Sequence, residues 1–237
     1  MTALYLESPP DAALDVALSH ALLRAGTEAV RLWTPPPALS FGRLDLLSPG
    51  AERAISGARK AGLTPVRRLA GGRAAAIGPW TVCVGAAYPG PQAPELTQRR
   101  YESFSAVLLA ALRSLGVDAR VGELDGEWCP GSWSVLAGSS KVAGLAQRVI
   151  RVGAWVEAVL VVDVPQAARK ALDEVQRELG VPWNPATFAG LRGVSSGQLI
   201  AALRESVASH WELDEAELAP ELWHLARSLR GEHVICS

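Results

Sequence analysis

Apolar side chains recur at helical spacing in several stretches of the chain, and most of these stretches end next to a glycine. One covers residues 11–25 before Gly26, and the most regular covers 101–115 before Gly116. Ser48-Pro49 has the composition of an N-cap followed by the first helical residue. The pattern therefore predicts helices at 11–25, 48–61, 101–115, 165–180 and 199–211, and a last helix interrupted at Pro220.

Shorter apolar runs bounded by proline, glycine or serine predict the strands. Two of these runs surround Gly71-Gly72 and are expected to lie on either side of a glycine turn. The predicted strands are 29–33, 38–41, 64–70, 73–88, 119–124, 132–136, 141–151 and 154–164. Helices interrupt this series irregularly, without the regular alternation typical of a parallel sheet. We therefore expect an α+β fold with a mainly antiparallel sheet flanked by helices.

Length and composition set the scale of the fold. The chain has 237 residues, of which 49% are hydrophobic and 20% charged, so it can bury a large core. Residues 1–182 are expected to form the main domain, with 183–237 as a helical extension packed on it. The formal net charge of -1 gives no overall basic surface for nucleic acid. No stretch reaches the roughly 18 apolar residues of a membrane span.

The cysteines and histidines argue against a metal centre. Cys83, Cys129 and Cys236 are odd in number and far apart, and none forms a CxxC pair. This usage predicts a reduced, cytoplasmic protein without a disulfide framework or a metal site. Cys83 lies in an apolar run and is expected in the core. The four histidines have no ligand-like spacing and are expected at the surface or in helices: His20, His210, His224 and His233.

Candidate chemistry is concentrated in residues 127–151, EWCPGSWSVLAGSSKVAGLAQRVIR. Cys129 stands directly before Pro130-Gly131, which excludes a mid-helix position and favours a loop or strand edge. There the thiol is either presented to a substrate or buried as a small apolar group. Lys141 follows in a segment of small residues, and its amine is either a cation near the site or a solvated surface charge.

A second stretch, RRLAGGR at residues 67–73, combines paired arginines with paired glycines. Such glycines let the backbone approach a ligand closely while the guanidinium groups meet anionic groups. The alternative is a glycine turn with a solvated basic edge. The chain has no GxxxxGK[ST], GxGxxG or HExxH motif, so it carries none of these nucleotide or zinc signatures.

Together, RRLAGG and the later GSSKVAGLAQR resemble the lipoate–protein ligase, octanoyltransferase and biotin–protein ligase superfamily. Its members carry an R-R-x-x-G-G turn before a strand, and a later segment whose lysine contacts the acyl group. The element CPGSWS resembles the octanoyl-[glycine-cleavage H protein]:protein amidotransferase branch, in which the cysteine holds the acyl group as a thioester. The resemblance implies a class II synthetase-like biotin/lipoate ligase catalytic domain that transfers octanoyl or lipoyl groups.

The resemblance also implies roles for individual residues. Cys129 corresponds to the acyl-carrying nucleophile and Lys141 to the catalytic lysine. Substrate-binding positions around the acyl group are Arg67, Arg68, Gly71, Gly72, Ala75, Gly144 and Gln147. The small side chains that leave room for an acyl chain between strands, or else reflect tight sheet packing, are Ala74, Ala75, Ala76, Ala143, Gly144 and Ala146.

Two departures from the family pattern bear on the cofactor. Lipoate ligases usually carry a histidine or aspartate pair a few residues after the glycines, where this chain has Ile77 and Gly78, and only short helices follow Pro182. Both departures favour acyl transfer without a cofactor over an ATP- and magnesium-dependent ligase. The ligase stays as one alternative, and a non-catalytic acyl-binding relative is the other. Arg73 has no role in this interpretation.

The partners implied by the resemblance are proteins that carry lipoyl domains. They are the glycine-cleavage H protein and the acyltransferase subunits of 2-oxoacid dehydrogenases, and acyl carrier protein is a further candidate donor. Neither nucleic acid nor a membrane is expected as a partner.

Overall fold

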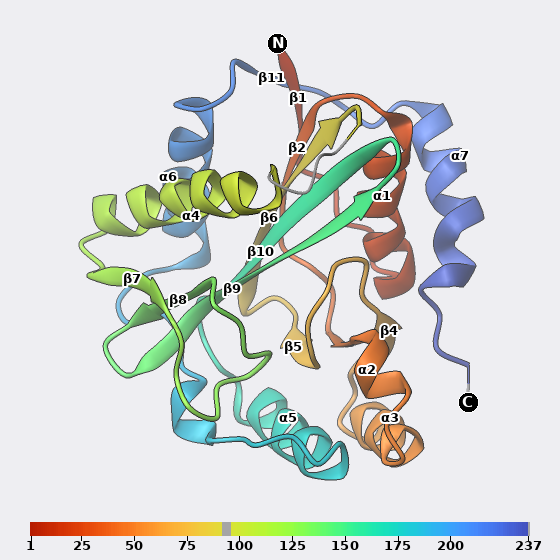
Figure 1. The fold of residues 1–237 in the computed structure, drawn as a ribbon, viewed down its shortest axis with the longest axis vertical. Coiled ribbons are helices and arrows are strands. Elements are labelled where there is room, and N and C mark those ends of the chain that lie inside the picture. The colour runs from red at the N-terminus through yellow and green to blue at the C-terminus, as the bar shows by residue number, and fades with distance from the viewer. Residues whose placement is uncertain (92–95, 237) are drawn as a thin grey trace.

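An eight-stranded sheet forms the centre of the fold in the computed structural model, which describes residues 1–91 and 96–236 (Figure 1). From one edge to the other its strands are β11 (Leu213–Glu215), β1 (Thr2–Tyr5), β2 (Ala29–Trp33), β6 (Thr81–Pro89), β10 (Gly153–Val161), β9 (Ser140–Ile150), β8 (Ser134–Ala137) and β7 (Ala119–Gly122). The expected α+β fold with a mainly antiparallel sheet is confirmed, because only the two pairs made by β1 are parallel.

A second, three-stranded sheet corrects one prediction from the sequence. Its middle strand is β3 (Ala38–Phe41), which pairs parallel with β4 (Thr64–Arg67) and antiparallel with β5 (Ala75–Ile77). The strands on either side of Gly71-Gly72 therefore do not form a hairpin, because β3 lies between them. Instead of a tight turn, the segment between β4 and β5 is a wide loop that reaches other parts of the chain.

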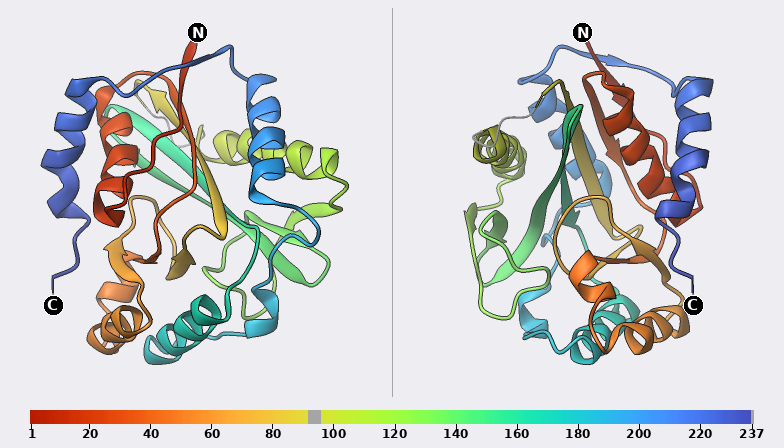
Figure 2. Two further views of the ribbon diagram at one scale, coloured as in Figure 1. Left: turned by 180° about the vertical axis from the view of Figure 1, so that it is seen from behind. Right: turned by 45° about the vertical axis from the view of Figure 1, so that its right-hand side comes forward.

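Helices cover both faces of the large sheet (Figures 1 and 2). On one face lie α4 (Leu96–Ser114) and α6 (Ser196–Ala208), which pack on each other over a core that includes Phe104, Leu108 and Leu203. On the other face lie α1 (Ala12–Ala25) and α7 (Pro220–Leu229), which also pack on each other. Apolar stripes on these helices thus close the two sides of the sheet.

A further helical layer lies next to the small sheet. The chain passes from β3 to β4 through α2 (Arg43–Leu46) and α3 (Ala51–Lys60), and α3 packs on α5 (Gln166–Glu178). The N-cap of α3 is Gly50, so the prediction that Ser48 caps this helix is wrong. Close packing accounts for the glycine, because a Cβ at Gly50 would lie 1.7 Å from the Glu178 carbonyl oxygen.

Residues beyond Pro182 pack on the structure that precedes them. They form η1 (Pro185–Thr187), α6, β11, α7 and η2 (Arg230–Glu232). Pro220 is the first residue of α7, so the predicted interruption there is wrong; proline is tolerated at a helix start because its missing N–H has no partner in the first turn. Within residues 1–91 and 96–236, none of the helices combines the length and the hydropathy needed to cross a bilayer.

Two histidines are buried. His20 lies in the helix α1, one of the two expected positions, with 7% of its surface exposed. His233 follows η2 with 3% exposed, so it is neither at the surface nor in a helix as expected. Their rings meet, with 3.1 Å between His20 Nδ1 and His233 Nε2. His233 Nδ1 also lies 2.9 Å from the Arg67 carbonyl oxygen, which fixes the C-terminal segment against β4.

Candidate active site

Cys129 lies in the loop between β7 and β8, and its backbone has an unusual conformation. Its φ is 44°, and in the part of the chain that the structure describes it is the one non-glycine residue with a positive φ. The left-handed conformation costs an L-residue roughly 1–2 kcal/mol. The preceding Trp128 is 3% exposed and packs edge-on against Phe188, so the core anchors the loop next to the cysteine. Strain of this kind is retained where the surrounding structure fixes a side chain in place.

Two N–H groups from the loop between β4 and β5 meet the Cys129 sulfur. Arg68 Nη1 donates to Sγ at 3.2 Å, and the main-chain N–H of Arg73 donates to the same atom at 3.2 Å. Arg68 Nη1 also donates to the Arg73 carbonyl oxygen at 2.9 Å, which holds the guanidinium in the loop. Gly72 permits this approach, because its φ is 114° and a Cβ there would lie 2.5 Å from the sulfur.

These contacts favour the thiolate form of Cys129. Burial raises the pKa of the thiol, but the charges of Arg68 and Lys141 and the hydrogen bonds from Arg73 and Arg68 outweigh burial, so the pKa lies below its ordinary value. For Arg68 burial acts in the other direction and lowers the pKa of the guanidinium, but the negative charges of Cys129 and Glu157 outweigh burial, so the pKa of Arg68 is raised. The site therefore stabilises the thiolate of Cys129 against a guanidinium that keeps its charge.

Arg73, which the sequence pattern left without a role, contacts the buried carboxylate of Asp45. Arg73 Nε lies 2.6 Å from Asp45 Oδ1, and the other oxygen of this buried carboxylate accepts the Gly42 N–H at 2.9 Å. A Cβ at Gly42 would lie 1.9 Å from the Gly72 carbonyl oxygen. The short helix α2 is thus pressed against the glycine segment and fixes the N–H that reaches Cys129.

Lys141 lies at the start of β9 and is buried, with 1% of its surface exposed, so the solvated-charge alternative is excluded. Its amine donates to the carbonyl oxygens of Cys129 and Trp128 at 2.6 and 2.9 Å, and to Glu127 Oε1 at 3.3 Å. Burial lowers the pKa of Lys141, and the charges of Cys129 and Glu127 oppose this shift without cancelling it. The amine is therefore bonded to the loop backbone, while Arg68 is the cation bonded to the sulfur.

Gly144 and Gly71 lie close to this centre. A Cβ at Gly144 would lie 3.2 Å from Lys141 Cε and 3.4 Å from the Trp128 ring, so the glycine leaves room for both side chains. The Gly71 N–H points to the Gln147 carbonyl oxygen at 3.5 Å. The Gln147 amide itself turns toward α4, where it accepts from Arg100 Nε at 2.9 Å.

Two predicted substrate-binding residues lie apart from the thiol. Arg67 is exposed at the end of β4, and its main chain bonds the C-terminal segment through the His233 carbonyl oxygen at 2.9 Å. Ala75 is buried in β5, where its carbonyl oxygen accepts from Ser40 Oγ at 3.2 Å. The paired arginines thus face different surroundings, and it is the second that contacts Cys129.

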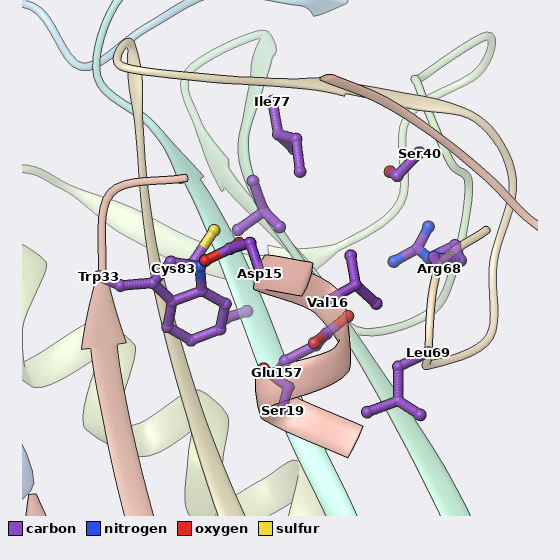
Figure 3. A pocket seen from close by; sticks show the side chains of 12 residues that line it. Asp15, Val16, Ser19, Trp33, Ser40, Arg68, Leu69, Ile77, Cys83 and Glu157 are labelled. Atoms are coloured by element: carbon purple, nitrogen blue, oxygen red, sulfur yellow. The ribbon is translucent and has the colours of Figure 1, made fainter. Parts of the chain in front are cut away.

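A cavity of about 40 Å³ is lined in part by Arg68 (Figure 3). Arg68 and Leu69 stand on one side of it, Trp33 and Cys83 on the other, and Glu157 projects between them. Cys83 is buried as expected. Six small residues expected beside the acyl chain are absent from the lining of this cavity: Ala74, Ala75, Ala76, Ala143, Gly144 and Ala146.

The cavity is small for an eight-carbon chain. An apolar cavity that binds benzene measures about 150 Å³, so at about 40 Å³ this space must widen before it can hold an octanoyl group. Ile77, at one of the two positions that depart from the ligase pattern, lines the cavity, and Gly78 turns the chain by accepting from Thr81 Oγ1 at 2.9 Å.

Comparison with known proteins identifies the chain. A family model described as the lipoyl protein ligase A/B catalytic domain matches residues 11–183. The chain belongs to this family. An octanoyl-[GcvH]:protein N-octanoyltransferase of Geobacillus kaustophilus is 31% identical over 221 residues, which cover 93% of the chain and 77% of that protein. A lipoyl-[GcvH]:protein N-lipoyltransferase of Listeria monocytogenes is 25% identical over 149 residues, 63% of the chain and 54% of that protein.

Solved structures show the same fold. A lipoate-protein ligase A bound with ATP superposes with a TM-score of 0.79 at 20% identity, and the match covers 98% of this chain and 94% of the ligase chain. A bi-partite lipoate protein ligase from Thermoplasma acidophilum gives a TM-score of 0.70 at 18% identity, covering 98% and 92%. The predicted lipoate ligase family and its class II synthetase-like fold are confirmed.

Sequence reasoning missed one residue at the centre of this lipoyl ligase-type site. Glu127 is fully buried two positions before Cys129, and its carboxylate lies 3.3 Å from the Lys141 amine. In the sequence Glu127 is not distinguished from Glu123 and Asp125, and its one available signal is its position next to Trp128 and Cys129. Within residues 1–91 and 96–236, no group of three or more His, Cys, Asp or Glu side chains is arranged to hold a metal ion.

Proposed function

We propose that this chain is an acyltransferase that moves an octanoyl or lipoyl group from the glycine-cleavage H protein to a lysine of another lipoyl domain, through a thioester on Cys129. The names of its relatives from Geobacillus kaustophilus and Listeria monocytogenes support the reaction and the donor. The observation that carries the proposal is the Cys129 sulfur, held at 3.2 Å from both a guanidinium and a main-chain N–H in a strained turn.

The first half-reaction transfers the acyl group to the enzyme. The Cys129 thiolate attacks the carbonyl carbon of the donor's acyl-lysine amide, so a C–S bond forms and the carbonyl oxygen becomes an oxyanion. The C–N bond then breaks and the amine leaves with a proton taken from solvent. The cation of Arg68 and the N–H of Arg73, already at the sulfur, are the groups placed to stabilise the charge that moves from sulfur to oxygen.

The second half-reaction regenerates the thiolate. A neutral lysine amine of the acceptor attacks the thioester carbon, a C–N bond forms, the C–S bond breaks, and the amine's extra proton passes to solvent. Since Arg68 stabilises the departing thiolate, it lowers the energy of the leaving group in this step. The three N–H donors of Lys141 already have acceptors, so Lys141 contributes its positive charge to the site and no further hydrogen bond.

The acyl chain is proposed to enter the cavity beside Arg68 once its lining side chains move apart. Burial of seven or so methylenes contributes roughly 5 kcal/mol at about 0.8 kcal/mol each, which offsets the cost of that opening. On this proposal the acyl chain extends from Cys129 past Arg68, which bonds the sulfur, toward Trp33 and Cys83 in the cavity lining. The reducing cytoplasm, which keeps a catalytic thiol free, is the proposed compartment.

The test is an acceptor assay with two donors. Purified enzyme and a lipoyl domain of a 2-oxoacid dehydrogenase are incubated either with octanoylated glycine-cleavage H protein and no ATP, or with free octanoate, ATP and magnesium. The proposal predicts acceptor acylation in the first mixture only, and its loss in Cys129→Ala. Acylation in the second mixture alone would identify an ATP-dependent ligase, and acylation in neither would leave a non-catalytic acyl-binding protein.

A further inference from the structure

A buried carboxylate organises the loop that carries Cys129. Glu127 is fully buried, and its Oε1 accepts from the Ser134 hydroxyl at 2.5 Å and from the Gly131 N–H at 3.1 Å. Its Oε2 accepts from the Leu124 N–H at 3.1 Å. These donors come from both ends of the loop, so one side chain ties together the segment in which the cysteine stands.

The same carboxylate bonds the Lys141 amine, whose other two donors go to successive carbonyl oxygens of the loop, those of Trp128 and Cys129. Three acceptors around one amine match the three N–H groups of an ammonium, whereas a neutral amine has only two. Successive carbonyls point to opposite sides of an extended chain, so both can face one ammonium only if the backbone curls between them. That curl is the left-handed conformation of Cys129.

We propose that Glu127 is a positioning residue for the nucleophile: it keeps Lys141 as an ammonium bonded to the loop carbonyls, and through Lys141 it holds the turn that places the Cys129 thiol against Arg68. This proposal rests on the proposed function, in which that thiol is the nucleophile. Glu127 acts through Lys141 and does not itself touch the sulfur in the bonds described.

The charges around the thiol show why the carboxylate matters. Arg68 and Lys141 are the cations that face Cys129, and the phenol of Tyr101 on α4 faces it as well. Glu157 of β10 and Asp45 of α2 face Arg68 and keep it charged. For Lys141 the attractive charges are Cys129 and Glu127, while burial and the charge of Arg68 lower its pKa.

Removal of the Glu127 charge therefore leaves a buried ammonium with one fewer anion beside it. The pKa of Lys141 falls further, which favours the neutral amine, and a neutral amine has too few N–H groups for the loop carbonyls. Cys129 then keeps one of its two facing cations, so its thiol pKa rises. A merely structural role in the loop would change the stability of the fold and leave this titration in place.

The test compares Glu127→Gln with Glu123→Gln by the rate at which iodoacetamide alkylates Cys129 as a function of pH. A Cys236→Ser background removes the exposed thiol, and peptide mass mapping separates Cys129 from the buried Cys83. Glu123 is an exposed carboxylate of the same loop that accepts from Ser132 at 2.7 Å. The expected result is an alkylation rate about three- to tenfold lower near pH 7 for Glu127→Gln, and a wild-type profile for Glu123→Gln.

Three further variants separate positioning from folding. Lys141→Met is expected to slow alkylation as Glu127→Gln does, and the double variant no further, because both act through one contact. Ser134→Ala removes a donor without changing a charge, so it should lower thermal stability and keep the wild-type midpoint. Glu127→Asp keeps the charge at a shorter reach and should fall between wild type and Glu127→Gln.

An unchanged alkylation profile in a folded Glu127→Gln overturns the proposal. If that variant does not fold, Glu127→Asp decides, since an unchanged profile there has the same meaning. Alkylation needs no acyl donor, so the two failures are distinguishable. A shifted profile in an enzyme that forms no acyl adduct refutes the proposed function alone, and an unshifted profile in an enzyme that forms one refutes the role of Glu127 alone.

Discussion

Replacement of Arg68 by methionine tests which cation lowers the pKa of the Cys129 thiol. The substitution keeps an unbranched side chain of similar reach and removes the guanidinium that donates to the sulfur at 3.2 Å. From the sequence, one expected role of Lys141 was that of a cation near the site, but its amine bonds the loop carbonyls and not the sulfur. Arg68→Met should therefore raise the thiol pKa, and the neighbouring Arg67→Met, at an exposed position, should not.

The size of the effect follows from the contact. An opposite charge within about 4–6 Å lowers the pKa of an acidic group by roughly 1–3, so removal of Arg68 reduces the thiolate population by roughly 10- to 1000-fold at a pH below the wild-type midpoint. A thiolate of higher pKa is also more nucleophilic, with a Brønsted coefficient of about 0.4–0.5. This returns about half of the loss on a logarithmic scale, so the alkylation rate at that pH should fall by roughly 3- to 30-fold.

The assay is the pH dependence of iodoacetamide alkylation of Cys129 in the Cys236→Ser background, followed by intact mass. The account predicts a higher midpoint for Arg68→Met, a midpoint between it and wild type for Arg68→Lys, and the wild-type midpoint for Arg67→Met. Lysine restores a charge but not the planar guanidinium, whose Nη1 bonds both the Cys129 sulfur and the Arg73 carbonyl oxygen. A wild-type midpoint in Arg68→Met, with the fold intact, would refute the thiolate–guanidinium interpretation.

Two further predictions concern the backbone of the site and the pH dependence of stability. Gly72→Ala should lower the free energy of unfolding by roughly 1–3 kcal/mol and displace the thiol, because its Cβ would lie 2.5 Å from Sγ. Gly131→Ala has open space around the Cβ and should change neither the free energy of unfolding nor the alkylation rate. Equal effects in the two variants would contradict this prediction. Burial, followed by the charge of His233, lowers the pKa of His20 from 6.5 to about 4. The contribution of neutral His20 to the free energy of unfolding is therefore fully present above pH 6.5 and is lost as the pH falls toward 4. Urea unfolding should show a loss on the order of 3 kcal/mol across that window, which His20→Gln reduces; identical pH slopes in the two proteins would count against it.

The sequence predicted most of the elements whose apolar pattern is long and regular. The helix at α1 ends at Gly26 in the left-handed conformation, and the β9–β10 pair lies where two long strands were expected. The strands that were missed, β1 and β11, contain 4 and 3 residues and lie at the parallel edge of the sheet. Residues 213–215 carry two carboxylates and form no apolar run, and the pairing of β1 with β11 joins residues from opposite ends of the chain.

The motifs brought Cys129, Arg68 and Gly72 to attention, but not the contacts among them. Paired arginines look equivalent in the sequence, and only the packing of β4 shows that the second faces the sulfur. Lys141 was recognised by its motif, while its bonds depend on the buried carboxylate of Glu127. Charges that are paired inside the fold cannot be told from solvated ones by spacing alone.

The most direct test of the account is whether Cys129 carries the acyl group. Enzyme is incubated with octanoylated glycine-cleavage H protein without ATP, and its intact mass is measured before and after hydroxylamine. The account predicts one added octanoyl group on the wild type, its removal by hydroxylamine, and no adduct on Cys129→Ala. Acceptor acylation that continues undiminished in Cys129→Ala would contradict the thioester mechanism.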